Sequence, residues 1–111
     1  MMSEDSVMIA RLWKGKSTKA KADAYQHHFA TTVERSLKAI AGHKGAYLLR
    51  RDDNGQVEFL ALTLWDSLET IKRFTGADPD VAIVEPDGRA ALTEFDDFVK
   101  HYEVVHSGVT H

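Results

Sequence analysis

The chain has 111 residues, of which 43% are hydrophobic and 28% charged, and a formal net charge of −3. This length predicts one domain over residues 1–111, with flexible tails at 1–6 and 107–111. A mildly acidic chain is a poor partner for nucleic acid, and a chain without cysteine has no disulfide, thiolate nucleophile or zinc–thiolate site. No segment resembles a secretory signal or approaches the roughly 20 apolar residues of a membrane span. We therefore expect a soluble cytoplasmic protein that binds neither nucleic acid nor membrane.

The first predicted elements are a strand and a long helix. Hydrophobic alternation over residues 7–13 is typical of a strand, and residues 15–18 are expected to end it. From residue 19 to about 41 the pattern predicts one amphipathic helix, because apolar residues recur every three or four positions. That stripe consists of Tyr25, Phe29, Val33, Leu37 and Ile40. Gly42 suits the position that follows a helix end.

The most hydrophobic stretch, residues 57–65, is expected to form the centre of the sheet. It carries Val57, Phe59, Ala61, Thr63 and Trp65 on one face of a strand, and Leu60, Leu62 and Leu64 on the other. Such a strand needs cover on both faces, and a chain of this length has few residues to supply a second cover. We therefore expect a second copy of the chain to cover the leucine face, giving a homodimer through the sheet.

Turn and capping signals flank this central strand. Asn54-Gly55 predicts a tight hairpin that joins it to an antiparallel strand at residues 46–51. Asp66 or Ser67 can cap a helix that follows directly. The apolar residues of that helix recur at helical spacing and are Leu68, Ile71 and Phe74.

Beyond this helix the pattern is weaker. Short helical pieces are expected at 80–84 and 89–93, followed by a last strand at 99–106. The resulting order of strand, helix, strand, strand, helix and strand predicts an α+β fold, a ferredoxin-like βαββαβ antiparallel sheet with helices on one face. Right-handed crossovers place the first and third strands in its middle.

Several side chains have both a structural and a functional interpretation. Trp65 is either a core aromatic or a flat wall with a donor for an aromatic ligand. His28 lies beside the helix stripe, where it either faces a cleft as a base or sits at the surface. Arg11 and Arg50 are on otherwise apolar faces and either reach towards solvent or anchor an anionic group. The histidines lack the spacing of a metal site, so no metal is expected.

Four segments in order carry a family pattern: 7–13 (VMIARLW), 42–51 (GHKGAYLLRR), 59–67 (FLALTLWDS) and 101–105 (HYEVV). The sharpest piece is Trp65-Asp66-Ser67 at the end of the central strand. Together they resemble the antibiotic biosynthesis monooxygenase family of the dimeric α+β barrel superfamily. The resemblance implies a homodimer whose two sheets form a barrel, with a pocket between the helices and the sheet of each subunit. Some relatives oxidise aromatic polyketides with molecular oxygen and without any cofactor.

The resemblance also implies where a ligand would bind. It directs the Trp65 face of the central strand towards the helices. The candidate catalytic residues are His28, as a base chosen for its place beside the helix stripe, and Trp65, as the wall that positions the substrate. The substrate-binding residues expected from this placement are Tyr25, Phe29, Phe59, Thr63 and Phe74. Ala61 stands where the polyketide oxygenases carry asparagine. Haem degradation is disfavoured, because the first strand has no asparagine and the second helix has Phe74 where haem-degrading relatives have tryptophan.

Two functions from different classes follow. The first is a cofactor-independent monooxygenase of a small aromatic or quinone-like substrate, in which a base removes a proton and the anion reacts with oxygen away from water. The second is a non-catalytic dimeric ligand-binding or stress-associated protein that uses the same pocket without turnover.

Overall fold

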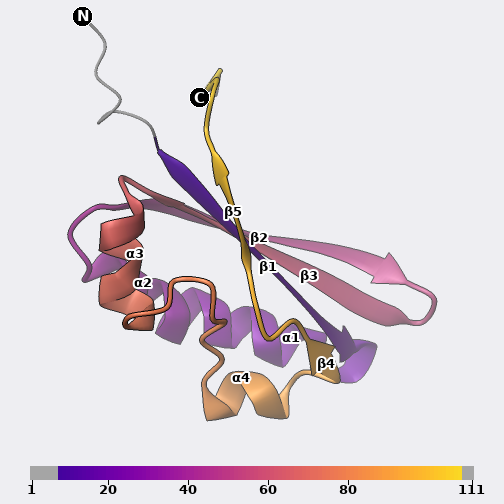
Figure 1. The fold of residues 1–111 in the computed structure, drawn as a ribbon. Helices are drawn as coiled ribbons and strands as arrows, with labels where there is room; N and C mark the ends of the chain where they lie inside the picture. Colours follow the sequence, from indigo (N-terminus) through magenta and orange to yellow (C-terminus); the bar gives the residue numbers. More distant parts are fainter. Residues whose placement is uncertain (1–7, 109–111) are drawn as a thin grey trace, which may run out of the picture.

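The chain forms an antiparallel sheet whose central strands are β1 (Ile9–Thr18) and β3 (Gln56–Trp65). On one side β2 (His43–Asp53) pairs with β3, and on the other β4 (Glu94–Phe95) and β5 (Lys100–Glu103) pair with different parts of β1 (Figure 1). The predicted α+β, ferredoxin-like arrangement is therefore confirmed, including its two central strands.

The computed structural model describes residues 8–108. Residue 7, the expected tail at 1–6 and the last three residues of the expected tail at 107–111 lie outside that range. Residues 107 and 108 belong to no helix or strand.

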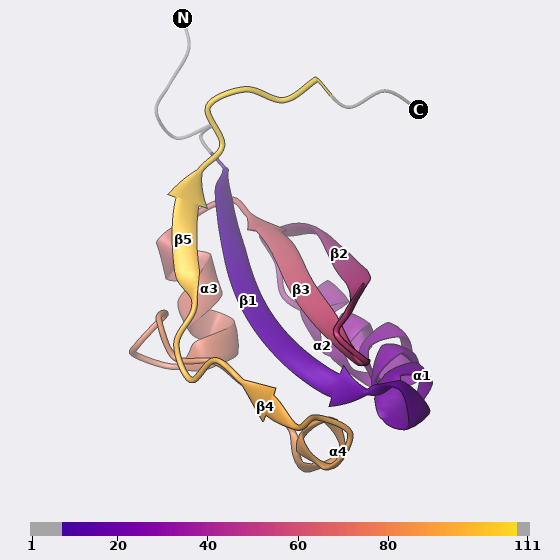
Figure 2. The same cartoon turned by 90° about the vertical axis from the view of Figure 1, so that its right-hand side faces the viewer.

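Helices cover one face of this sheet. The segments α1 (Lys19–His28), η2 (Phe29–Val33) and α2 (Glu34–Lys38) follow one another as one rod, and α3 (Leu68–Thr75) lies near its far end (Figure 2). The short α4 (Pro86–Ala90) packs beside α1. Within residues 8–108, none of these helices is long and apolar enough to cross a membrane.

The two faces of β3 differ in burial, as its alternation predicts. Val57, Phe59, Ala61, Thr63 and Trp65 are buried beneath the helices. The leucines between them are only half-buried, because they lie on the open face. Register pairing extends this open face across the sheet to Leu12, Tyr47, Leu49 and Tyr102.

The predicted long helix contains a π-helical turn at η2, where the Glu34 N–H donates to the Phe29 carbonyl oxygen. The apolar stripe on this rod steps by four residues from Tyr25 to Phe29, Val33 and Leu37. In an α-helix each such step overshoots a full turn by about 40°, so the stripe would rotate away from the sheet. The wider π turn reduces this drift, and such turns are frequent at functional sites.

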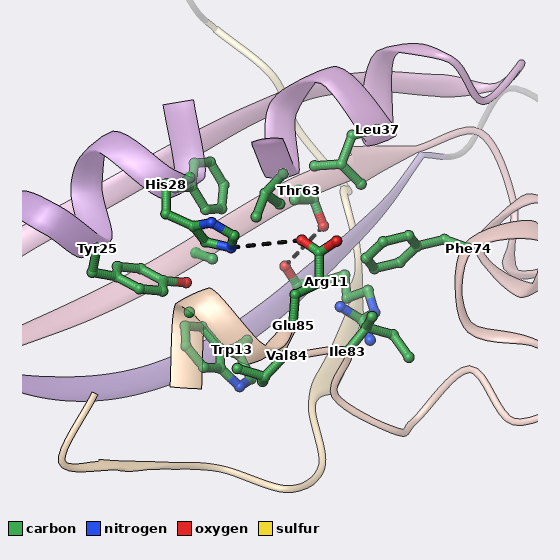
Figure 3. Close-up of a pocket in the computed structure, with 14 residues that line it drawn as sticks. Arg11, Trp13, Tyr25, His28, Leu37, Thr63, Phe74, Ile83, Val84 and Glu85 are labelled. Atoms are coloured by element: carbon green, nitrogen blue, oxygen red, sulfur yellow. Dashed lines mark hydrogen bonds and ion pairs between the residues drawn. The ribbon is translucent and has the colours of Figure 1, made fainter. Parts of the chain in front are cut away.

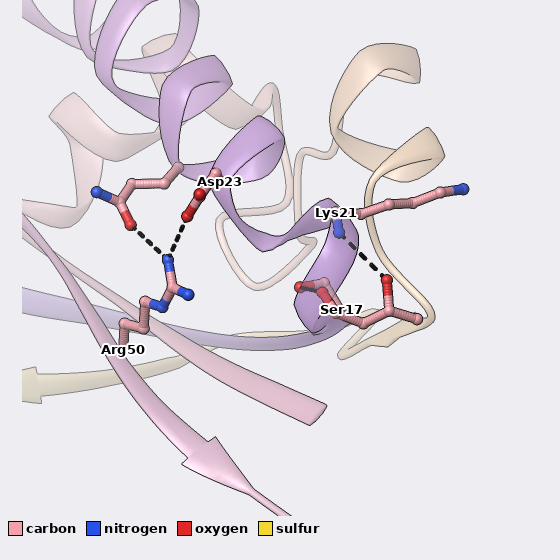
Figure 4. A network of polar contacts seen from close by, with 6 residues as sticks. Ser17, Lys21, Asp23 and Arg50 are labelled. Carbon is pink, nitrogen blue, oxygen red and sulfur yellow. Dashed lines mark hydrogen bonds and ion pairs between the residues drawn. The ribbon is translucent and has the colours of Figure 1, made fainter. Parts of the chain in front are cut away.

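The first strand runs further than predicted. The expected break at 15–18 is wrong, because the ladder with β3 continues to the pair Thr18 and Gln56. Gly15 is buried where the Trp13 ring crosses it, and an added Cβ would lie 2.7 Å from that ring. The strand then passes directly into α1, where Thr18 accepts a hydrogen bond from the Lys21 N–H at 3.2 Å (Figure 4).

The segment after α3 also differs from the prediction. Residues 80–84 are not helical, because they run beside residues 97–99 through hydrogen bonds such as Ala82 N–H to the Asp97 carbonyl oxygen. The helix expected at 89–93 instead begins at Pro86, a residue whose missing N–H and fixed φ suit a first helical position. The last strand is shorter than 99–106 and spans only β5.

Candidate functional site

A cavity lies between the helical rod and the sheet, closed on its outer side by residues 83–88 (Figure 3). Its volume is about 40 Å³, counted as the space open to the centres of water molecules. This is room for about three waters. Apolar side chains form most of the wall, namely Trp13, Phe29, Val33, Leu37, Ala61, Phe74, Ile83 and Val84. The polar groups on its lining belong to Arg11, Tyr25, His28, Thr63 and Glu85.

His28 is the cavity's imidazole and is only 9% exposed. It sits at the end of α1, and its Nε2 lies 3.6 Å from Oε1 of Glu85, which precedes α4. This pair is positioned by two packed helices. Gly88 lets α4 approach α1 closely, since an added Cβ on Gly88 would lie 3.3 Å from the His28 ring. His28 also borders a wider surface groove of about 590 Å³ between α1 and α4.

Thr63 and Tyr25 add hydroxyl groups to the wall. The Thr63 Oγ1 accepts a hydrogen bond from the Trp65 indole N–H at 2.9 Å and donates one to the Arg11 carbonyl oxygen at 3.5 Å. Tyr25 packs on Phe59 with ring centroids 5.0 Å apart. Burial raises the pKa of Tyr25 far above its usual value, so its hydroxyl stays protonated in the physiological range and acts as a donor.

Arg11 places a positive charge in the same wall. It is 6% exposed, its Nη2 donates to the Val81 carbonyl oxygen at 2.7 Å, and its guanidinium lies 5.5 Å from the centre of the Phe74 ring. Burial lowers the pKa of Arg11 to about 10, against the opposing effect of Asp80. The side chain therefore remains charged at neutral pH.

The structure brings five of the seven predicted site residues together around the cavity: Tyr25, His28, Phe29, Thr63 and Phe74. The other two lie behind its wall. Phe59 is fully buried against Tyr25, and Trp65 is fully buried in a separate cluster with Leu37 and Ile71. Trp65 touches the cavity wall from behind, through its hydrogen bond to Thr63 and its stacking on Phe74.

Sequence reasoning missed three residues that shape the cavity. Trp13 lines it directly and donates its indole N–H to the Asp96 carbonyl oxygen at 3.0 Å. The sequence signal that could have identified Trp13 as a lining residue is its position on the same strand face as Arg11. Glu85 and Gly88 come from a segment with no periodicity, where the proline at the start of α4 was the only indication of a helix.

The Trp65-Asp66-Ser67 segment forms the N-terminal cap of α3. Ser67 caps this helix by accepting a hydrogen bond from the Thr70 N–H at 3.1 Å, and Asp66 accepts one from the Thr70 hydroxyl. The hydrogen bond from the Thr70 hydroxyl, together with one from the Ser67 hydroxyl at 3.2 Å, lowers the pKa of Asp66. Gly42 (φ +98°) lies against this turn, where a Cβ would meet Thr70 at 2.6 Å.

Metal-ligating side chains do not cluster in the part of the chain that the structure describes. Among residues 8–108, no group of three or more histidine, aspartate or glutamate side chains is arranged to hold an ion.

Comparison with solved structures identifies the same fold. A candidate antibiotic biosynthesis monooxygenase from Bacillus cereus is 17% identical, with a TM-score of 0.65 over 94% of this chain and 99% of that one. A protein of unknown function from Nitrosomonas europaea is 9% identical, with a TM-score of 0.68 over 96% and 98% of the two chains. The ActVA-Orf6 monooxygenase of Streptomyces coelicolor, in complex with nanaomycin D, is 12% identical, with a TM-score of 0.53 over 98% and 95%.

Sequence comparison assigns the family. Among curated proteins, none is significantly similar to this chain. The model of the antibiotic biosynthesis monooxygenase family, however, matches residues 8–86, which include the three main strands, the helical rod and α3. The chain therefore belongs to the antibiotic biosynthesis monooxygenase family.

Proposed function

We propose that the chain is a cofactor-independent monooxygenase of a small aromatic or quinone-like substrate that binds in the helix–sheet cavity. The observation that carries this proposal is the buried His28 imidazole, which faces an apolar cavity and has the Glu85 carboxylate beside it. A neutral imidazole accepts a proton near neutral pH, and a neighbouring carboxylate stabilises the imidazolium that results.

The reaction needs only a base, an enclosed cavity and oxygen. His28 removes a proton from a ring CH₂ group next to a carbonyl, and the resulting enolate forms a carbon–oxygen bond with O₂. The peroxide takes the proton back from His28 and loses water, which leaves a carbonyl group. One oxygen atom thus enters the product, the other leaves as water, and the substrate carbon supplies the electrons. The apolar wall excludes bulk water from the anion.

The remaining predicted site residues fit supporting roles in this proposal. Phe29 and Phe74 form flat apolar walls, and the Tyr25 hydroxyl is available as a donor to the substrate oxygen. Trp65 acts as a positioning residue, because its N–H fixes the Thr63 hydroxyl. Phe59 supports the Tyr25 ring from behind.

The size of the cavity indicates how a substrate enters. Space for about three waters is too small for an aromatic ring system. Residues 83–88, a loop followed by the start of the short α4, form the outer wall of the cavity, and we propose that they move outward when a ligand binds. The related ActVA-Orf6 structure contains nanaomycin D, an aromatic quinone, which supports a ligand of this class.

Oxygen uptake with anthrone as the substrate tests the proposal. The wild type should form anthraquinone faster than the spontaneous reaction, with one ¹⁸O atom from labelled O₂ in the product. His28→Gln should lower kcat roughly 100-fold or more, because it removes the base. His27→Gln is the matched control, since His27 is adjacent but exposed and does not border the cavity.

Two outcomes would overturn catalysis by His28. One is equal activity of the His28→Gln and His27→Gln variants. The other is tight binding of anthrone-like compounds without any oxygen uptake, which would favour the non-catalytic ligand-binding alternative.

We also propose that the open sheet face joins two copies of the chain. Leu60, Leu62 and Leu64 of β3 are half-buried there, and the neighbouring Leu49 is 48% exposed. Apolar rows that cross strands β2, β3 and β1 form a contiguous patch, and such patches on small proteins usually bind another protein surface. A second copy is the occupant that the chain itself supplies, since its own patch is complementary by symmetry.

Light scattering after size-exclusion chromatography tests the dimer. The wild type should run as a dimer at micromolar concentration, and Leu49→Glu should give monomer, because a carboxylate would be buried in the apolar contact. Leu68→Glu is the control, since Leu68 is 44% exposed but lies on α3, away from the open face. A monomeric wild type would exclude the proposed dimer.

A further inference from the structure

Arg11 is a buried charge that lacks a carboxylate partner. Its guanidinium has five N–H donors. In the described part of the chain, the Val81 carbonyl oxygen accepts one of them and no carboxylate forms an ion pair with Arg11. The Nε atom is closed off from solvent and has no acceptor. Buried charges are costly unless they are paired, so this arrangement is unusual for a purely structural arginine.

The ionisable groups around Arg11 form no direct ion pair with it in the described residues. His101 is its cross-strand neighbour on β5, and the Asp80 carboxylate is engaged with His101 at 3.2 Å. Asp80 raises the pKa of Arg11 by its charge, but it is not bound to the guanidinium. Glu85, the carboxylate on the cavity wall, pairs with His28. Arg11 is therefore the charged donor on the cavity wall that has no carboxylate bound to it.

We propose that Arg11 anchors an anionic oxygen of the ligand, so that the cavity selects planar aromatic compounds with a carboxylate or an ionised phenol or enol. This inference rests on the cavity of the proposed function, but it does not depend on turnover. A guanidinium meets a carboxylate through paired N–H donors, and these charge-assisted bonds are stronger in a water-poor site. The ligand would supply the directly bound anionic partner that Arg11 lacks.

The placement of Arg11 also fixes an orientation for the ligand. Its guanidinium packs against the Phe74 ring at one end of the cavity, while Trp13 and His28 border the rest (Figure 3). A ligand anchored at Arg11 would extend its aromatic body beneath the closing segment at 83–88. The ring carbons of the ligand would then lie towards His28.

Calorimetric titration with three aromatic probes tests the anchor. 2-Naphthoate carries a carboxylate, 2-naphthamide is its neutral counterpart, and 4-nitrophenol, which ionises near neutral pH where Arg11 stays charged, separates a phenolate from a phenol. The wild type should bind 2-naphthoate at least tenfold more tightly than 2-naphthamide at pH 7. In Arg11→Met the Kd for 2-naphthoate should rise at least tenfold while that for 2-naphthamide changes less than threefold.

Arg50→Met is the matched control. Arg50 also lies near an aromatic ring of this sheet face, but it donates to Asp23 and Gln26 outside the cavity (Figure 4). It should retain the full preference for 2-naphthoate, and Arg11→Lys should retain part of it. Equal affinity of the wild type for 2-naphthoate and 2-naphthamide would overturn the anchor without any variant, even if Arg11→Met failed to fold.

The outcomes separate this inference from the proposed catalysis. A preference for 2-naphthoate that disappears in Arg11→Met supports the anchor, whether or not oxygen is consumed. Oxygen uptake with no preference between the two probes would retain the catalytic proposal and reject the anchor. Failure of every probe to bind would reject the anchor together with the cavity as a ligand site.

Discussion

The two tryptophans of this chain lie on the same face of the sheet, yet their surroundings differ. Trp65 on β3 is fully buried in a filled cluster with Leu37 and Ile71. Trp13 on β1 is 7% exposed and borders the cavity. One half of the helix-covered face is therefore solid core, and the other half has room for a ligand.

The difference comes from the elements that cover each half. Above Trp65, α2 and α3 bring Leu37, Ile71 and Phe74 into direct contact with the indole or its cluster. Above Trp13 the cover includes the π turn of the rod and the loop-rich segment at 83–88. Irregular elements leave space that two regular helices would fill, so the candidate site forms where the cover is irregular.

The largest expected difference between the two halves is in how much each tryptophan contributes to stability. Trp65→Ala should lower the free energy of unfolding by about 5 kcal/mol, because it leaves a void in filled core. Trp13→Ala should cost less, about 3 kcal/mol, because one side of the ring already faces a cavity. Urea denaturation of both variants measures this difference. An equal or larger loss for Trp13→Ala would show that the two halves are equally packed.

A smaller effect is expected from filling the irregular half. An added methyl group in Gly88→Ala would lie 3.3 Å from the His28 ring and push α4 and the imidazole apart. We expect a loss of stability of about 1 kcal/mol, typical of mild overpacking, and a several-fold weaker affinity for 2-naphthoate. Unchanged affinity in Gly88→Ala would separate α4 from the ligand site.

The smallest expected effect is the pH dependence of stability, which involves His43 in the filled half of the helix-covered sheet face. His43 packs against Trp65 with ring centroids 5.0 Å apart, and burial lowers the pKa of His43, partly offset by Glu34. The folded state disfavours the protonated form of the His43 ring. The free energy of unfolding is therefore highest above the unfolded pKa of about 6.5, and it falls as the pH decreases below that value. His101 acts in the same direction.

Urea midpoints at pH 7.5 and pH 5.5 measure this dependence. The wild type should be less stable at pH 5.5, and the double variant His43→Gln with His101→Gln should show a smaller decrease. A decrease of the same size in the double variant would assign the pH dependence to other groups.

Much of the fold could be predicted from the sequence, because it depends on local pattern. Alternation along residues 57–65 identified both the buried face and the half-exposed leucine face of β3. Asn54-Gly55 located the hairpin between β2 and β3, and Ser67 located the start of α3. These signals act within a few residues, and the structure retains them.

The cavity could be predicted only in part, because its shape depends on contacts between distant segments. Alternation placed Trp65 on the correct face but could not show that α2 and α3 fill the space above it. Gly15 was expected to break β1, yet its missing side chain makes room for the Trp13 ring. Glu85 reaches the site from a segment without periodicity, and only the packing of α4 on α1 brings it to His28.

The most direct test of the cavity is ¹⁹F NMR of protein labelled with 5-fluorotryptophan, which has two tryptophan resonances. Trp13→Phe and Trp65→Phe assign them. Saturation with 2-naphthoate should shift the Trp13 resonance strongly and leave the Trp65 resonance nearly in place, because Trp13 alone borders the cavity. A shift of the Trp65 resonance with an unchanged Trp13 resonance would contradict the site described for this chain.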